Sequence, residues 1–292
     1  MRKYSVLILC IFFIIQAAAC TTKTVKIEGF ASPESVISDG TYFYVSNVGE
    51  KLKPMDKDGD GFISRLSADG AVIERKFISN LNAPKGMVVL NGVLYVADID
   101  RVKGFSVTDG SQVYDLDFSD KGTSLLNDIT ILGDGKLLVS ATDTGALYEF
   151  DSGDSPTIKS IETDVDLSGP NGIVFDPEDG SVYIASYGKN NEPNGFISKG
   201  RIKNGRLKSD IIHSKGGFYD GIALYDGKVL FSDWVAFEKK GVIVMLNSKS
   251  GESSVLDTGE EIAGPADFYL DKNSKKMWIP MMMENKILIV SF

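Results

Sequence analysis

Six stretches of the sequence share one pattern, and this repetition constrains the fold more than any other feature. Each stretch opens with a short lead-in, passes through a turn rich in Gly, Asp or Asn, and ends in a β-prone run such as VLYVAD or SVYIAS. The second residues of the lead-ins are separated by 51, 42, 44, 49 and 46 positions. These six residues are Glu34, Lys85, Asn127, Asn171, Asp220 and Ala266.

Repeats of about 40 to 50 residues with room for four strands are typical of β-propellers. We therefore predict an all-β, six-bladed β-propeller over residues 24–292, in which each lead-in begins the innermost strand of a blade. The last repeat has only three β-prone runs. We expect residues 24–30, TVKIEGF, to supply its outer strand, which closes the ring and leaves no free sheet edge.

The first residues are expected to be absent from the mature protein. A short basic head, an apolar run and three alanines are the parts of a secretory signal, and the apolar run is shorter than the roughly 20 residues of a membrane-spanning helix. Cys20 follows the alanines, an order similar to the bacterial lipobox. We expect a lipoprotein-type signal peptide at residues 1–19, lipidation of Cys20, and a tether at residues 20–23.

The expected location is the bacterial cell envelope, with the lipid holding the protein at the periplasmic face or the outer membrane. The alternative is ordinary cleavage after Ala19, which gives a secreted or periplasmic protein with Cys20 as a free thiol. Lipidation is preferred, because an exposed free Cys is of little use in an oxidising compartment. The other Cys, Cys10, lies in the signal, so the mature chain forms no internal disulfide.

The net charge of −9 excludes some classes of partner. An acidic surface repels nucleic acid and suits cations, or neutral and cationic small molecules. Loss of Arg2 and Lys3 with the signal brings the charge to −11. We expect a monomer that binds a small-molecule substrate or ligand, has no nucleic-acid partner, and meets the membrane through its lipid anchor only.

The second residue of each lead-in lies where an inner strand enters the propeller channel, so all six point toward one axis. Four carry side-chain oxygens: the carboxylates Glu34 and Asp220, and the amides Asn127 and Asn171. Calcium takes about 6 to 8 oxygen ligands, whereas zinc and copper favour thiolate or imidazole. This set predicts a calcium site, with another hard divalent cation as the alternative.

A simpler interpretation treats Asn171-Gly172 and Asp220-Gly221 as turn formers only. Glu34 is not a turn residue, however, and four oxygen donors at one repeat position favour the metal.

The motifs around these residues resemble one known family. Glu34 opens the first blade, Asn127 lies in LND, Asn171 in PNGI and Asp220 in YDGI. The pattern, over residues 28–292, resembles the SMP-30/gluconolactonase family and, more distantly, the paraoxonases and diisopropylfluorophosphatase. The resemblance implies a channel calcium held by these four residues.

The same resemblance implies hydrolysis of a lactone, ester or phosphoryl bond, with Asp220 as base or nucleophile and Glu34 as the second candidate. Leu125 stands where sugar lactonases usually carry Arg, so sugar contacts are not implied. A function of a different class is a non-catalytic ligand- or protein-binding propeller with a structural calcium.

Further residues are expected at the mouth of the channel. Tyr187, Trp234 and Met282 should form an apolar, substrate-binding wall, whereas Trp278 should pack between blades. Lys85 enters the channel either to bind an anionic group of the substrate or to balance the acidic ring, and charge balance is the preferred interpretation. Acidic residues at the ends of second strands should add charge to the rim: Asp98, Asp143 and Asp233.

The only histidine, His213, is expected at an outer strand end, away from the axis. Without a partner it argues against a Ser-His-Asp triad and against a lyase that needs a histidine at the axis.

The stretch MDKDGDG has the spacing of a calcium-binding loop through Asp56, Asp58 and Asp60. The twelfth position of such a loop requires Glu and is Ser67 here. An acidic turn is therefore expected, with a weak peripheral ion as the alternative.

Overall fold

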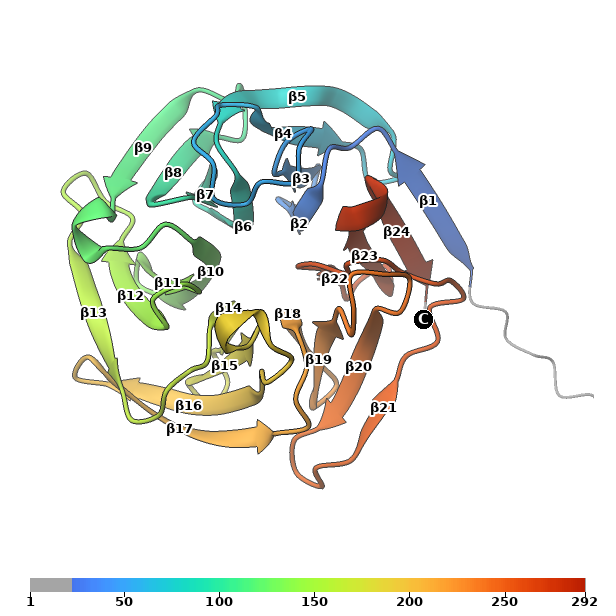
Figure 1. Ribbon diagram of the computed structural model, residues 1–292. Coiled ribbons are helices and arrows are strands. Elements are labelled where there is room, and N and C mark those ends of the chain that lie inside the picture. Colours follow the sequence, from blue (N-terminus) through green and yellow to red (C-terminus); the bar gives the residue numbers. More distant parts are fainter. Residues whose placement is uncertain (1–22, 292) are drawn as a thin grey trace, which may run out of the picture.

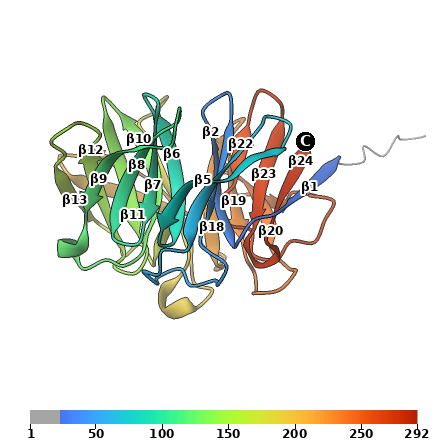
Figure 2. The same cartoon turned by 90° about the horizontal axis from the view of Figure 1, so that it is seen from above.

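The computed structural model describes residues 23–291, which form an all-β, propeller-like ring with its strands arranged around one axis (Figure 1). Figure 2 shows the ring from the side, with loops extending from both faces. The predicted signal peptide, Cys20 and nearly all of the tether lie outside the described residues. Within the described part, no helix is long and apolar enough to cross a membrane.

Four of the sheets have four antiparallel strands each. The first contains β2 (Pro33–Ser38), β3 (Phe43–Asn47), β4 (Gly61–Leu66) and β5 (Val72–Leu81). The second contains β6 (Pro84–Leu90), β7 (Val93–Asp98), β8 (Arg101–Ser106) and β9 (Gln112–Asp117). Another contains β18 (Tyr219–Tyr225), β19 (Lys228–Asp233), β20 (Val242–Asn247) and β21 (Ser253–Val255). The last contains β22 (Tyr269–Asp271), β23 (Lys276–Met281), β24 (Lys286–Ser291) and β1 (Thr24–Glu28).

The remaining sheet has eight strands. One half comprises β10 (Leu126–Gly133), β11 (Lys136–Ala141), β12 (Ala146–Asp151) and β13 (Ile158–Thr163). The other half comprises β14 (Pro170–Asp176), β15 (Ser181–Ser186), β16 (Ile197–Lys203) and β17 (Arg206–His213). The halves are joined where β13 and β17 pair in parallel, at Glu162 with Arg206 and at Thr163 with Leu207. The repeat predicts six separate units, and this joint was not anticipated.

Helical structure in the described residues is limited to three single-turn 3₁₀ helices, in agreement with the all-β prediction. These are η1 (Ser119–Lys121), η2 (Lys189–Asn191) and η3 (Met282–Glu284).

The N-terminal strand closes the ring, as predicted. Strand β1 pairs antiparallel with β24 and forms the outer strand of the last sheet. An ion pair of 2.9 Å between Lys286 Nζ and Glu28 Oε1 lies at one end of this pairing. Nearby, the Ser32 backbone N–H donates to Asn285 Oδ1 at 2.7 Å. The seam between the first and last sheets is therefore held by both backbone and side-chain contacts.

Five of the inner strands carry the same irregularity at their start. The register of β2 with β3 shifts between Pro33 and Val36, and the inner strands β6, β10, β14 and β18 shift at the corresponding place. A bulge removes two residues from regular pairing and re-aims their side chains. In these five strands the second and third residues of the lead-in are thereby freed from the ladder, and the side chain of the second residue is directed into the channel.

Glycine at the third lead-in position allows neighbouring inner strands to approach closely. A Cβ added to Gly172 would lie 2.2 Å from the carbonyl oxygen of Asp220 on the next inner strand. A Cβ on Gly86 would lie 2.5 Å from Asp128 Oδ1. The backbones around the axis are therefore packed too closely for a side chain at these positions.

Apolar residues fill the spaces between neighbouring sheets. Tyr44 of the first sheet, for example, belongs to the same buried cluster as Leu94 of the second. Trp278 is fully buried and stacks on Phe43 across the seam, with ring centroids 3.9 Å apart. Trp278 therefore packs between sheets, as predicted.

Replacing Gly172 with Ala should destabilise the protein, because the new Cβ meets backbone atoms that cannot rotate away. We expect a loss of about 1–3 kcal/mol in the free energy of unfolding, the usual range for overpacking, measured by denaturant titration. Gly153→Ala is the matched control, because its Cβ would meet nothing within 4 Å. Equal effects at the two positions would contradict close packing at the axis.

Candidate functional site

The starts of the inner strands surround one cavity of about 400 Å³. Glu34, Lys85, Asn127, Asn171 and Asp220 all line it, each at most 5% exposed. The structure therefore brings together five of the six second lead-in residues, from five different inner strands. The sixth, Ala266, is fully buried in the apolar cluster beside the cavity.

Four oxygen atoms in this cavity have no hydrogen-bond partner. They are Glu34 Oε2, Asn127 Oδ1, Asn171 Oδ1 and Asp220 Oδ1, and all are buried. A buried oxygen without a partner costs free energy, and such groups usually bind something. Each of these atoms belongs to a different inner strand, so their convergence is a property of the ring.

Asp220 is held in one orientation by an indole. Trp234 Nε1 donates to Asp220 Oδ2 at 3.0 Å, and both side chains are buried. One carboxylate oxygen is thus occupied, while Oδ1 remains without a partner. Trp234 therefore acts on Asp220 directly, in addition to its expected place in the cavity wall.

Burial raises the pKa values of the acidic groups in the channel, so these groups release their protons less readily. It raises the pKa of Asp220 to about 8, aided by the nearby Asp267 carboxylate and opposed by hydrogen bonds from Trp234 and Asn171. Burial and the Asp220 charge also raise the pKa of Glu34 well above its usual range. Asp220 thus holds its proton up to neutral pH unless a cation lies beside it.

Lys85 contacts the rim loop. Its Nζ donates to the carbonyl oxygens of Pro54, at 2.7 Å, and Ala83, at 2.9 Å. Burial lowers the pKa of Lys85 to about 8, against the opposing effect of Glu34. Lys85 therefore anchors the β3–β4 loop (residues 48–60), a role that the sequence did not suggest.

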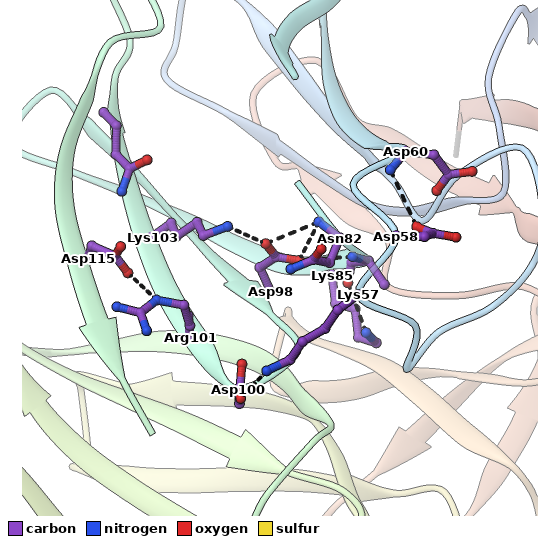
Figure 3. A network of polar contacts seen from close by, with 12 residues as sticks. Lys57, Asp58, Asp60, Asn82, Lys85, Asp98, Asp100, Arg101, Lys103 and Asp115 are labelled. Atoms are coloured by element: carbon purple, nitrogen blue, oxygen red, sulfur yellow. Dashed lines mark hydrogen bonds and ion pairs between the residues drawn. The ribbon is translucent and has the colours of Figure 1, made fainter. Parts of the chain in front are cut away.

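A polar network lies beside Lys85 (Figure 3), and in it Lys57 of the β3–β4 loop pairs with Asp100. Asp98 is fully buried and accepts hydrogen bonds from the backbone of Asn82 and Ala83 and from Lys103 Nζ. The prediction that Asp98 lies on the rim is therefore wrong, because its carboxylate oxygens are directed inward. Of the two other acids expected there, Asp143 is exposed beside the cavity, whereas Asp233 accepts from the backbone of its own loop.

The expected apolar wall is present. Tyr187, Trp234 and Met282 all line the cavity. Leu125, which stands where sugar lactonases usually carry Arg, also lines the cavity. Sequence reasoning did not single out the other apolar residues of the wall, which come from loops without periodicity. These are Val48, Leu52, Pro54 and Phe237.

The other end of the channel carries two acidic residues that the sequence analysis missed. Asp128 accepts from the backbone N–H groups of Ile129 and Ile173, both at 2.7 Å. Asp267 Oδ2 accepts from Ser35 Oγ at 2.5 Å. Both carboxylates line a second cavity of about 490 Å³ on the opposite face. The sequence did contain a signal for them, because both residues occupy the third position of a lead-in.

The remaining sequence motifs lie outside the main cavity. His213 packs against the rings of Tyr219 and Phe231 at centroid distances of 5.8 and 5.2 Å, and does not line the cavity. Asp56 pairs with Lys53 at 2.5 Å.

Within the β3–β4 loop, Asp60 Oδ2 accepts from the Glu50 backbone at 3.2 Å. Asp58 Oδ1 accepts from the Asp60 backbone at 3.3 Å. All three aspartates of the calcium-loop spacing therefore make contacts within their own loop.

No group of three His, Cys, Asp or Glu side chains within residues 23–291 is placed to hold a metal. Any cation in the main cavity must therefore rely on the amides of Asn127 and Asn171 as well as on the two carboxylates.

The fold defines a class of protein, the propeller proteins. No protein-family model and no curated protein matches the chain. Among solved structures, virginiamycin B lyase from Staphylococcus aureus is similar, with a TM-score of 0.64, 16% identity, and coverage of 93% of this chain and 99% of that one. Luciferin-regenerating enzyme is similar at a TM-score of 0.66 and 11% identity, covering 93% and 95%. At these identities the likeness concerns the fold alone.

Removal of the Lys85 amine should release the β3–β4 loop. In Lys85→Met the stem remains but the hydrogen bond that anchors the loop at Pro54 is lost. Such a bond from a charged donor contributes roughly 1.5–3 kcal/mol. We expect trypsin to cut at Lys51 or Lys57 at least about 10-fold faster than in the wild type, as followed by mass spectrometry. Lys208→Met, on the exposed outer edge, is the control. Unchanged cleavage in Lys85→Met would show that the loop is held by other contacts.

Proposed function

We propose that this protein is a calcium-dependent hydrolase of small-molecule lactones or esters, related to the SMP-30/gluconolactonase group. The four buried, partnerless oxygens of Glu34, Asn127, Asn171 and Asp220 carry this proposal. Counting the eight-stranded sheet as two joined blades gives the six blades expected for that group. The similar solved structures include propeller enzymes, which is compatible with catalysis on this fold.

The donor set fits a hard divalent cation. Two carboxylates and two amide carbonyls are oxygen ligands of the kind that calcium prefers, and among residues 23–291 no His or Cys lines the cavity. The match is also electrostatic, because a cation compensates the buried Glu34 and Asp220 charges that otherwise require protons. When bound, the cation supplies a Lewis acid for a carbonyl oxygen.

The residues of the chain take the remaining roles. Asp220 is the base or nucleophile, since Trp234 fixes one of its oxygens and leaves the other free; Glu34 is the second candidate. Tyr187 and Met282 exclude water from the reacting bond. Lys85 keeps the β3–β4 loop over the cavity, and it also balances the acidic ring.

Lyase chemistry based on an axial histidine is not proposed. A His-to-Ala variant of virginiamycin B lyase is catalytically inactive. The one histidine of this chain, His213, lies in an aromatic cluster outside the cavity. For location, we retain lipid anchoring at Cys20 in the bacterial envelope as part of the proposal.

Hydrolysis should depend on both calcium and Asp220. We expect turnover on a panel of aryl esters and lactones to be abolished by a chelator and restored by calcium. Asp220→Asn keeps the shape of the side chain and removes the base, so it should lower kcat by about 10²- to 10⁴-fold. Asp226→Asn, in an exposed turn at the end of the same strand, is the matched control.

Activity that persists in chelator and in Asp220→Asn would overturn the mechanism. Calcium binding that raises the melting temperature without any turnover on the panel would instead favour a non-catalytic binding propeller.

Calcium should stabilise the protein more at pH 8 than at pH 5. Burial raises the pKa of Asp220 to about 8 and of Asp267 to about 7, whereas both are near 3.8 in the unfolded chain. Between these values the folded state retains protons that the unfolded state has released, so stability without metal falls as pH rises from about 4 to 8.

Protons also compete with the cation for Asp220. The calcium-induced rise in melting temperature should therefore be at least about 5 °C larger at pH 8 than at pH 5. For a domain of this size, 1 kcal/mol of added stability corresponds to a rise of roughly 2–4 °C. Differential scanning calorimetry at both pH values tests this, and Asp220→Asn should reduce the difference. An equal rise at both pH values would contradict direct binding by Asp220.

A further inference from the structure

The two sides of the main cavity differ in chemistry. Toward β18 and the last sheet, its walls are the apolar side chains of Trp234, Phe237 and Met282, and Leu52 of the β3–β4 loop faces the same cavity. Phe237 is 48% exposed and Leu52 40% exposed. Exposed apolar side chains beside a cavity favour binding of an apolar group.

The opposite side of the cavity continues into a cleft of about 900 Å³. The cleft lies between the β11–β12 loop (residues 142–145) and the β15–β16 loop (residues 187–196), with Met55 of the β3–β4 loop at its edge. The cavity and the cleft have four lining residues in common: Leu125, Thr142, Tyr187 and Asn191. One ligand can therefore occupy both spaces.

The charged groups of the cleft already make contacts within the protein. Lys189 forms an ion pair with Asp166. Asp143 accepts from Thr123 Oγ1 at 2.7 Å and from the Ser124 backbone at 2.6 Å. The Lys189 charge is thus compensated by Asp166, and both oxygens of Asp143 already accept hydrogen bonds. These contacts favour an uncharged ligand over an ionic one.

Neutral polar groups in the cleft are free to bind. The side chains of Thr144, Asn190 and Asn191 are exposed and make no hydrogen bond within the described residues. Asn190 and Asn191 both have positive φ, 57° and 55°, an uncommon backbone state that is often found at functional sites. Asn194 Oδ1 accepts from the Lys189 backbone at 2.8 Å and holds this turn in shape.

We propose that the cavity and the cleft form one binding site for an elongated, uncharged amphiphile. Its apolar arm lies against Trp234 and Phe237, and its hydroxyl- or amide-bearing arm lies in the cleft against Thr144 and Asn191. The position of a reactive carbonyl between the two arms rests on the proposed hydrolase function. The binding itself does not, so a ligand without an ester bond tests it separately.

Hexyl β-D-glucoside and 1-hexanol are suitable probes, because they share an apolar arm and only the glucoside has a hydroxylated arm. Dissociation constants are measured by ligand-observed NMR with the full chain, below the micelle concentration. We expect the glucoside to bind at least about 10-fold more tightly than hexanol. The double variant Thr144→Val/Asn191→Gly should weaken glucoside binding about 3- to 10-fold, as expected for the loss of one or two hydrogen bonds, and leave hexanol unchanged.

Glycine suits the positive φ of Asn191, so this variant should retain its melting temperature. Thr108→Val/Asn204→Gly is the matched control, since Asn204 is also exposed with a positive φ of 52°. Phe237→Ala should weaken both probes by a similar factor.

Equal affinity of the two probes for the wild type, or an equal loss of both in the double variant, would overturn this inference. Selective glucoside binding without hydrolysis of any ester would uphold it and count against the proposed hydrolase instead.

Discussion

The crowding of inner strands around one axis is the constraint on which the site depends. The strands approach so closely that Gly172 has no room for a Cβ beside the Asp220 backbone. A bulge at the start of five of these strands directs the second residue of the lead-in into the channel. Packing that stabilises the ring therefore also removes water from its polar side chains, and this desolvation shifts the pKa values of Glu34 and Asp220.

The channel holds three buried acids, one partly buried acid and one buried lysine. The buried acids are Glu34, Asp128 and Asp220, the partly buried acid is Asp267, and the lysine is Lys85. Buried carboxylates are costly unless they are protonated, paired or bound to a metal. Asp128 and Asp267 have hydrogen-bond donors from neighbouring inner strands, whereas Glu34 and Asp220 each keep one oxygen without a partner. The carboxylates at the two ends of the channel thus differ in their hydrogen bonding. Only the end that faces the β3–β4 loop has oxygen atoms left free to bind a ligand.

Much of the fold followed from the repeat, because its period fixes where each inner strand begins and which residues meet at the axis. The closing strand β1 and the meeting of Glu34, Asn127, Asn171 and Asp220 were predictable for this reason. The contact from Lys85 to Pro54 was not, because it joins the axis to an aperiodic loop. The parallel joint between β13 and β17 also depends on how two outer edges meet in space, which no local pattern encodes.

The seam between the first and last sheets is where this ring can open. Strand β1 pairs with β24 from Thr24 with Val290 to Glu28 with Lys286, and a hydrogen bond links Ser32 to Asn285 across 253 positions. Such long-range contacts form late relative to local hairpins. Strand β1 has only five residues, and of these Val25, Lys26 and Glu28 are exposed. If β1 detaches, the backbone edge of β24 becomes a template for a strand from another molecule. A second copy can then donate its own β1, so the seam is the place where exchange of strands between rings would begin.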